Sequence, residues 1–127
     1  MADTCYARRA RQLGRTVSRV FDDALRPHGL TSSQLNLLVA IELHDGVRPA
    51  DLAHHLDLEK STLSRNLSRM QEHGWIEIQS DGGREQRLSL QPAGRRLLRL
   101  AYPAWTRAQE AVRERLGDSV LAALHAL

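Results

Sequence analysis

Apolar residues recur at steps of three or four along most of the chain, a spacing typical of helices that bury one face. The first such stretch runs from Tyr6 to Leu25 and ends before Pro27 and Gly29, which stop helices. Its opposite face carries arginines: Arg8, Arg9, Arg11, Arg15 and Arg19. An apolar stripe of this length must be covered by another surface, so we expect this helix to need a partner.

Three further helices are predicted before the pattern changes. They are expected from Thr31 to near Asp45, over 49–56 and over about 60–73. Pro49 suits the first position of a helix, because the N–H group that proline lacks is unused there. Residues 57–59 leave room for only a tight connection between the last two helices.

After Gly74 the apolar spacing drops to two residues, which predicts strands over 75–79 and 87–90 with a glycine-rich hairpin loop between them. Residues 92–116 return to helical spacing, and Pro103 inside that stretch is expected to kink or split the helix. A short final helix ends near the C-terminus.

The helix predicted over 60–73 carries the candidate chemistry. Leu63, Leu67 and Met70 form its inner stripe, so small hydroxyl, amide and arginine side chains must point outward. The residues of this outer face and its flanks are Ser61, Thr62, Ser64, Arg65, Asn66, Ser68 and Arg69. Solvent-facing helix surfaces usually favour Glu and Lys, whereas no acid occurs from Lys60 to Gln71. These groups match the base edges and phosphates of a DNA major groove.

The hairpin loop adds two arginines. Arg84 lies beside two glycines near the predicted tip, from which it could enter a narrow minor groove. Arg87 enters the return strand and either contacts DNA or pairs with Asp81 or Glu85.

Composition excludes several other classes of protein. The formal net charge of the 127 residues is +3, and the basic residues are almost all arginine, a bias that a GC-rich genome would also produce. Cys5 is the single cysteine, so an intrachain disulfide and a cysteine-rich zinc site are impossible. The sequence has no apolar stretch long enough for a signal peptide or membrane span, so we expect a cytoplasmic protein without membrane contact.

Several motifs, in this order and spacing, resemble the MarR (multiple antibiotic resistance regulator) family of bacterial transcriptional regulators. They are Gly29-Leu30-Thr31, Asp51-Leu52-Ala53 with Leu56, Ser61-Thr62-Leu63-Ser64-Arg65, Glu72-His73-Gly74-Trp75-Ile76 and Leu90-Gln91-Pro92-Ala93-Gly94. The likeness extends from about Tyr6 to Leu116. Where many relatives have Asp-Pro before the recognition helix, this chain has Glu59-Lys60, which weakens the cap of that helix but adds a basic side chain.

The resemblance implies a mainly α fold with a small β-hairpin wing (α+β), a winged helix-turn-helix with N- and C-terminal dimerisation helices. The whole chain, 1–127, would be one domain, with a DNA-binding module over about 31–91 and dimerisation helices over about 5–27 and 92–127. It also implies a homodimeric repressor on a pseudopalindromic double-stranded operator. By the resemblance, Thr62, Ser64, Arg65 and Asn66 would lie at bases or phosphates and Arg84 in the minor groove. Together with the outward-facing and hairpin residues described above, the candidate DNA-binding residues are Lys60, Ser61, Thr62, Ser64, Arg65, Asn66, Arg69, Arg84 and Arg87.

A small aromatic or phenolic effector is a further implication of the resemblance, with Tyr6, Arg15, Trp105 and His44 as candidate contacts. Two alternatives stay open. One is a redox-sensing repressor of the organic-peroxide type that uses Cys5, and the other is a winged-helix protein-interaction module without DNA binding. No pattern indicates an enzyme, a cofactor or a metal site.

Overall fold

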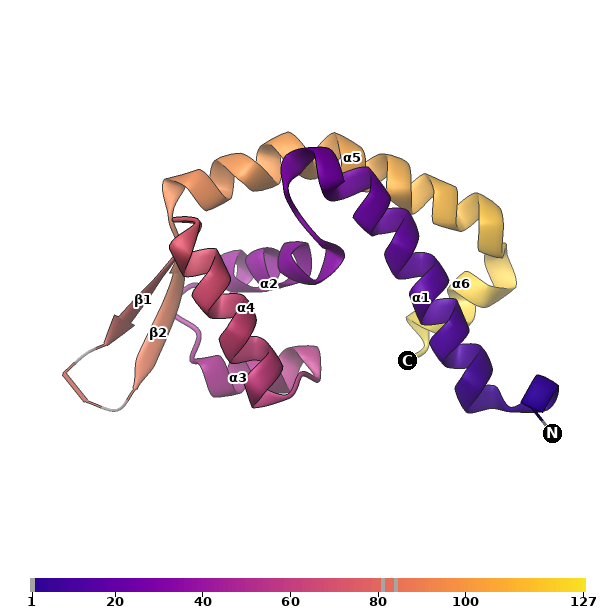
Figure 1. Ribbon diagram of the computed structural model, residues 1–127, viewed down its shortest axis with the longest axis horizontal. Helices are drawn as coiled ribbons and strands as arrows, with labels where there is room; N and C mark the ends of the chain where they lie inside the picture. The colour runs from indigo at the N-terminus through magenta and orange to yellow at the C-terminus, as the bar shows by residue number, and fades with distance from the viewer. Residues whose placement is uncertain (1, 81, 84) are drawn as a thin grey trace. The chain divides into compact units, whose positions relative to one another are not determined.

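Helices and a β-hairpin follow one another in the computed structural model, which describes residues 2–80, 82, 83 and 85–127 (Figure 1). The helices are α1 (Tyr6–Leu25), α2 (Ser32–Leu43), α3 (Pro49–Leu56), α4 (Lys60–Glu72), α5 (Pro92–Leu116) and α6 (Asp118–His125). The strands are β1 (Ile76–Ser80) and β2 (Gln86–Leu90), and short 3-10 turns lie at Ala2–Thr4 and Arg26–His28. The expected mainly helical fold with a small β-hairpin is confirmed. No helix among the described residues is long and apolar enough to cross a membrane.

The chain divides into two compact units. The first comprises Met1–Ser32 and Ala101–Leu127, and the second comprises Ser33–Leu100. The first unit therefore contains α1, α6 and the C-terminal part of α5, while the second contains α2, α3, α4, the hairpin and the start of α5. The functional division into a DNA-binding module and dimerisation helices stays a prediction.

Helix α5 passes from one unit into the other. The split that was one expected outcome at Pro103 does not occur, because the helix is continuous from Pro92 to Leu116. Proline removes one backbone donor from a helix and disturbs the preceding turn, but at Pro103 this does not end the helix. The boundary between the units falls before Ala101, within one turn of that proline.

The second unit has a core of aliphatic side chains from α2, α3, α4 and both strands. Helices α2, α3 and α4 bury side chains that recur at helical spacing, and the strands bury alternate residues, as their periods predict. The buried residues are Leu35, Leu37, Leu38, Ile41, Leu52, Ala53, Leu63, Leu67, Met70, Ile76, Leu88 and Leu90. This core fixes how α4 is rotated about its own axis.

The first unit has a smaller core and leaves apolar side chains uncovered. Its buried residues are Leu25, Leu30, Ala101, Ala104, Ala108 and Val112. Tyr6 is 90% exposed, Tyr102 is 64% exposed and Leu127 is fully exposed. Exposed apolar residues are ordinary in folded proteins, and the second unit also has some: Val39, Leu43 and Leu100.

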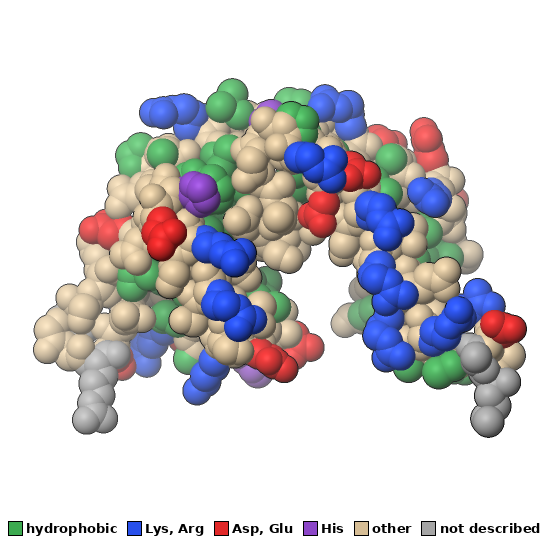
Figure 2. All heavy atoms as spheres, in the orientation of Figure 1, with side chains coloured by type: hydrophobic (Ala, Val, Ile, Leu, Met, Phe, Trp, Pro, Cys, Tyr) green, Lys and Arg blue, Asp and Glu red, His purple; other side chains and the backbone are tan. Residues whose placement is uncertain are grey.

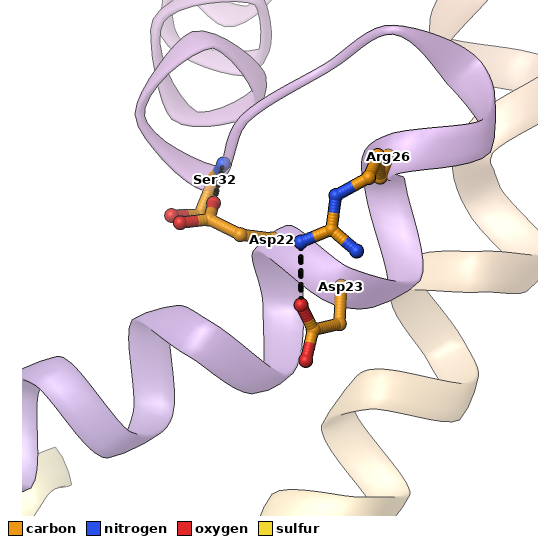
Figure 3. Close-up of polar contacts among 4 residues, drawn as sticks. All are labelled: Asp22, Asp23, Arg26 and Ser32. Atoms are coloured by element: carbon orange, nitrogen blue, oxygen red, sulfur yellow. Dashed lines mark hydrogen bonds and ion pairs between the residues drawn. The ribbon is translucent and has the colours of Figure 1, made fainter.

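The start of α2 is held by α1 (Figure 3). The backbone N–H of Ser32 donates to the carboxylate of Asp22 at 2.7 Å, so an orphan donor of the α2 N-terminus is satisfied by a side chain ten residues earlier. The adjacent Asp23 turns instead to Arg26, with which it forms an exposed ion pair at 2.6 Å. The sequence pattern did not reveal the Asp22 contact, because it is not local to the helix that it caps.

The hairpin is antiparallel, with Ile76 opposite Leu90 and Ile78 opposite Leu88. The predicted first strand is displaced by one residue, since it begins at Ile76 and not at Trp75. The N–H of Trp75 donates to the Met70 carbonyl at 3.0 Å, and the Trp75 carbonyl accepts from the Gln91 N–H at 2.9 Å. Both backbone groups of Trp75 are therefore engaged in ending α4 and starting α5.

Substitution of Asp22 by alanine should lower the free energy of unfolding by about 0.5–2 kcal/mol, the usual cost of losing a helix cap. Asp23→Ala is the matched control. Its ion pair with Arg26 is exposed and should contribute less than about 1 kcal/mol. Urea unfolding of the two variants checks this, and equal losses would show that the Asp22 contact does not cap α2.

Gly94→Ala should destabilise the fold by about 1–3 kcal/mol, because an added Cβ would lie 2.3 Å from the Trp75 carbonyl oxygen. Gly14→Ala is the matched control in α1, where an added Cβ meets nothing within 4 Å. It should stabilise the helix by about 0.5–1 kcal/mol. Thermal and urea unfolding report both changes, and a Gly94→Ala protein as stable as the parent would contradict the close approach.

Candidate nucleic-acid interface

Helix α4 is anchored by an apolar ridge on one side. Leu63, Leu67 and Met70 are 2%, 5% and 0% exposed, so the predicted inner stripe is confirmed. Because a helix has 3.6 residues per turn, burial of these three positions directs the intervening side chains away from the core. The rotation of α4 thus follows from its own sequence.

The opposite side of α4 faces solvent. Lys60, Ser61, Ser64, Arg65, Ser68 and Arg69 are exposed, while Thr62 and Asn66 are half-buried. Figure 2 shows Lys and Arg side chains following α4 over its length. The side-chain amide of Asn66 donates to the Thr62 carbonyl at 3.2 Å, which orients the amide while its oxygen still has hydrogen-bonding capacity. The acid-free stretch predicted for base reading therefore forms one accessible face.

The connection before α4 is a tight left-handed turn. Asp57 has a φ of 52°, the one positive φ of a non-glycine residue among the described residues. Its N–H donates to the His54 carbonyl and the N–H of Leu58 to the Ala53 carbonyl, a pair of bonds that closes α3. A side chain in this conformation is strained, and the sequence pattern gave no sign of it.

The N-terminus of α4 has no side-chain cap from Glu59, as the departure from Asp-Pro implied. The first amide groups of a helix carry a partial positive charge and are orphan donors. Lys60 and Ser61 are exposed beside them. This end of α4 therefore combines backbone donors, a hydroxyl and a cation, a combination that suits a phosphate.

The end of α4 is closed by two backbone hydrogen bonds at a left-handed glycine. Gly74 has a φ of 76°, its N–H donates to the Gln71 carbonyl and the N–H of Trp75 donates to the Met70 carbonyl. The imidazole of His73 stacks on the Trp75 indole, with ring centroids 4.4 Å apart. The hairpin therefore starts at a fixed position relative to α4.

The hairpin is also tied to the segment between α2 and α3, a contact that the sequence did not predict. Val47 and Leu88 form an antiparallel bridge, in which the Leu88 N–H donates to the Val47 carbonyl at 2.9 Å. The Gly46 N–H donates in turn to the Leu88 carbonyl at 2.9 Å. A single bridging residue has no period of its own, so alternation along the sequence could not reveal it.

Of the two wing arginines, the structure describes Arg87. Arg84 and Asp81 lie outside the described residues, so the predicted minor-groove role of Arg84 stays a prediction. Arg87 donates to the Gly46 carbonyl at 3.3 Å and lies 3.6 Å from Glu85, which also pairs with Arg48 at 3.1 Å. The pairing with Glu85 that the sequence left open is thus present, and a phosphate would have to compete with it.

A hollow of about 450 Å³ lies between the start of α3, one side of α4 and the hairpin. Its lining mixes aliphatic side chains with hydroxyl, amide and ammonium groups: Pro49, Ala50, Lys60, Leu63, Ser64, Leu67, Ser68, Gln71, Ile78 and Gln86. Several of these residues also belong to the exposed face of α4. A compound bound in the hollow would therefore lie beside that face.

The other candidate residues lie away from α4. Cys5 is exposed and directly precedes α1, while the guanidinium of the nearby Arg9 donates to the Asp3 carbonyl at 3.0 Å. His44 and His55 stack with ring centroids 5.3 Å apart. Within the part of the chain that the structure describes, no three His, Cys, Asp or Glu side chains are arranged to hold a metal ion. The redox alternative for Cys5 stays untested.

Two helices joined by a tight turn, an exposed acid-free second helix and a following hairpin define a winged helix-turn-helix of the DNA-binding type. A family model described as the MarR family matches residues 28–87. The transcriptional regulator MosR of M. tuberculosis, solved in complex with DNA, has a TM-score of 0.85 and 31% identity, covering 96% of this chain and 92% of that one. The chain belongs to the MarR family, a class of transcriptional regulators and not of enzymes.

Two further comparisons are consistent with this assignment. A mutant of E. coli MarR complexed with operator DNA has the same fold, with a TM-score of 0.84 at 20% identity over 94% of this chain and 88% of that one. The HTH-type transcriptional regulator YwoH of Bacillus subtilis is 25% identical over 77 residues. That match covers 61% of this chain and 56% of the length of YwoH.

Proposed function

We propose that this protein is a sequence-specific regulator of transcription that inserts α4 into the major groove of double-stranded DNA. The observation that carries the proposal is the division of α4 into a buried aliphatic ridge and an exposed face without acids. A solvated face would tolerate carboxylates, whereas a face that meets phosphates and base edges would be repelled by them.

The exposed groups have the chemistry that base reading requires. Arg65 and Arg69 can each donate two hydrogen bonds to guanine, and the amide of Asn66 can pair with adenine. Ser61 and Ser64 are small, so they would allow the helix backbone to approach the groove closely. Lys60 and the uncapped amides at the start of α4 would hold a phosphate and set the register of the helix on the duplex.

The wing would add a second contact to the same duplex. Backbone hydrogen bonds connect the hairpin to α4 through Trp75 and to the α2–α3 segment through Val47. These bonds hold the two strands in place relative to α4. We propose that Arg84 of the hairpin loop enters the minor groove, where negative potential is strongest. Arg87 would serve the phosphate backbone only when it leaves Glu85.

We further propose that the protein works as a homodimer on a pseudopalindrome. The first unit exposes Tyr6, Tyr102, Leu124 and Leu127, which a second copy would cover. Two-fold symmetry would place two α4 helices in successive major grooves, about 34–36 Å apart along the duplex. MosR, which is 31% identical to this chain, was solved in complex with DNA, and this supports DNA as the partner.

The regulator would act in the cytoplasm as a repressor that a small aromatic or phenolic effector releases. The hollow beside α4 supports this proposal, because an occupant next to Ser64 and Ser68 would compete directly with DNA. The effector contacts inferred from the resemblance are distributed differently: Tyr6, Arg15 and Trp105 belong to the first unit and His44 to the second.

Selection of bound fragments from a pool of random duplexes tests the function as a whole. The expected outcome is enrichment of an inverted repeat whose half-sites are about one helical turn, 10–10.5 base pairs, apart. Enrichment of a single unrepeated site would contradict the dimer. Absence of any enrichment would favour the alternative of a winged-helix module that binds proteins.

Replacing Arg65 by alanine should weaken binding to the selected repeat by about 1–3 kcal/mol and relax the preference at one base pair of each half-site, because alanine cannot make the bidentate hydrogen bonds of a guanidinium. Arg96→Ala, on an exposed position of α5, is the matched control for the removal of one charge. Fluorescence anisotropy with cognate and substituted duplexes measures both effects. If the two variants behaved alike, Arg65 would not read a base.

A further inference from the structure

The net positive charge of this chain belongs to the first unit, although α4 itself carries Lys60, Arg65 and Arg69. Residues 33–100 contain nine basic and nine acidic side chains, so the second unit has no net charge. The first unit contains nine basic and six acidic side chains and therefore accounts for the whole net charge of +3. Non-specific affinity for a polyanion follows positive charge, so the first unit is a candidate for such affinity in addition to α4.

Within the first unit the charge forms a row on α1. Arg8, Arg11, Arg15 and Arg19 follow one another at steps of three and four residues, which places them on one face of the helix. We call this row the arginine stripe. All four side chains are exposed, and Figure 2 shows basic side chains following α1. From Tyr6 through Phe21 the helix contains no acidic residue.

No carboxylate of the described part of the chain pairs with the stripe. Among residues 2–80, 82, 83 and 85–127, no ion pair involves any of its four arginines, whereas Arg26, Arg95 and Arg113 are each paired with an acid. Like charges at a spacing of four destabilise a helix by a few tenths of a kcal/mol per pair. Repulsion among the four arginines therefore lowers the stability of the free protein. A bound polyanion would replace this repulsion by attraction.

The rotation of α1 directs the stripe to solvent. Leu13, Val17, Val20 and Phe21 lie on the opposite face and are half-buried, and Leu25 is fully buried. Because the apolar face of α1 is already in use, the helix cannot sink that face into a lipid bilayer, as an amphipathic membrane helix does. An anionic membrane is thus a poor match for this surface.

A second copy of the chain is also a poor match for the stripe. Three of the six acidic residues of this unit already have partners: Asp22, Asp23 and Glu110. The other three, Asp3, Glu114 and Asp118, lie on three different elements and form no row. A regular row of cations needs a regular row of anions, which the first unit of one more copy does not offer.

Duplex DNA offers such a row. A rise of 1.5 Å per residue places successive arginines of the stripe about 4.5–6 Å apart along α1, and each DNA strand carries a phosphate about every 3.4 Å of helix axis. Arginine donates to phosphate in a bidentate manner. We propose that the arginine stripe of α1 is a second DNA-binding surface, which holds the phosphate backbone without reading sequence. This inference rests on the proposed function and adds to α4 a separate, sequence-independent contact.

The salt dependence of DNA binding tests this proposal. The variant is Arg11→Gln, Arg15→Gln and Arg19→Gln together, because glutamine keeps the helix propensity while it removes the charge. The matched control, Arg96→Gln, Arg99→Gln and Arg107→Gln, removes the same charge from exposed positions of α5. Affinity is measured against potassium chloride concentration with two long duplexes, one of unrelated sequence and one containing the selected repeat.

The stripe variant should bind both duplexes more weakly at low salt, and its plot of log affinity against log salt should be less steep by about 0.9 for each phosphate that the variant no longer neutralises. The preference for the repeat should be unchanged. Equal slopes for the wild type and the stripe variant, or equal effects of stripe and control variants, would overturn the proposal. Urea unfolding verifies the fold, and Arg15→Gln alone repeats the test with a slope change of about 0.9 for each protomer, which is about 1.8 for the proposed homodimer.

The same measurements separate this proposal from the proposed function. If the wild type preferred no sequence, the reading role of α4 would fail, whereas the slope on the unrelated duplex would still report on the stripe. If the wild type preferred the repeat and the stripe variant kept the wild-type slope, α4 would stand and the stripe would fail.

Discussion

Burial of the apolar ridge of α4 is the constraint on which the rest of the molecule depends. Leu63, Leu67 and Met70 contribute to the core of the second unit, and each is almost completely shielded from water. Full burial of a side chain of this size stabilises a fold by about 1.5–3 kcal/mol, which is far more than any preference of the outward residues for one orientation. The ridge therefore determines which face of α4 is presented to solvent, and that exposed face is the one proposed to read DNA.

The ends of α4 convert this rotation into a defined position. Asp57 adopts a left-handed conformation so that α3 can end and α4 begin within three residues, and Gly74 does the same at the other end. The backbone of Trp75 links the end of α4 to the start of α5, where Gly94 leaves room for the Trp75 carbonyl. Backbone hydrogen bonds therefore hold α4, the turn before it and the hairpin after it in one fixed arrangement.

Features with a period in the sequence could be predicted, and features made by single long-range contacts could not. The spacing of apolar residues located α1, α3 and α4 almost to the residue and identified the ridge. The Val47–Leu88 bridge, the Asp22 cap of α2 and the engagement of Trp75 each join residues from different elements, so no local pattern marks them. The start of β1 was misplaced by one residue for this reason. No sequence pattern specifies which group of DNA each outward residue of α4 contacts, so these roles stay predictions.

The two units of the chain differ in net charge. The unit that contains α4 is neutral overall and presents a few well-placed donors, whereas the unit that contains α1 carries the excess of arginine. In protein–DNA recognition, contacts to bases give specificity and contacts to phosphates give affinity. Under the two proposals, α4 would supply the base contacts and one phosphate contact, and the arginine stripe of α1 would supply further phosphate contacts.

Protection of a single thiol on α4 tests the central claim most directly. In a Cys5→Ser background, Ser64→Cys places the sole cysteine on the exposed face, and Ser119→Cys places it on α6 as a control. Alkylation by a small maleimide is timed with and without the selected duplex. The account predicts that DNA slows the reaction strongly for Ser64→Cys and leaves Ser119→Cys unchanged. An unchanged rate for Ser64→Cys, with the duplex demonstrably bound, would show that α4 does not enter the groove.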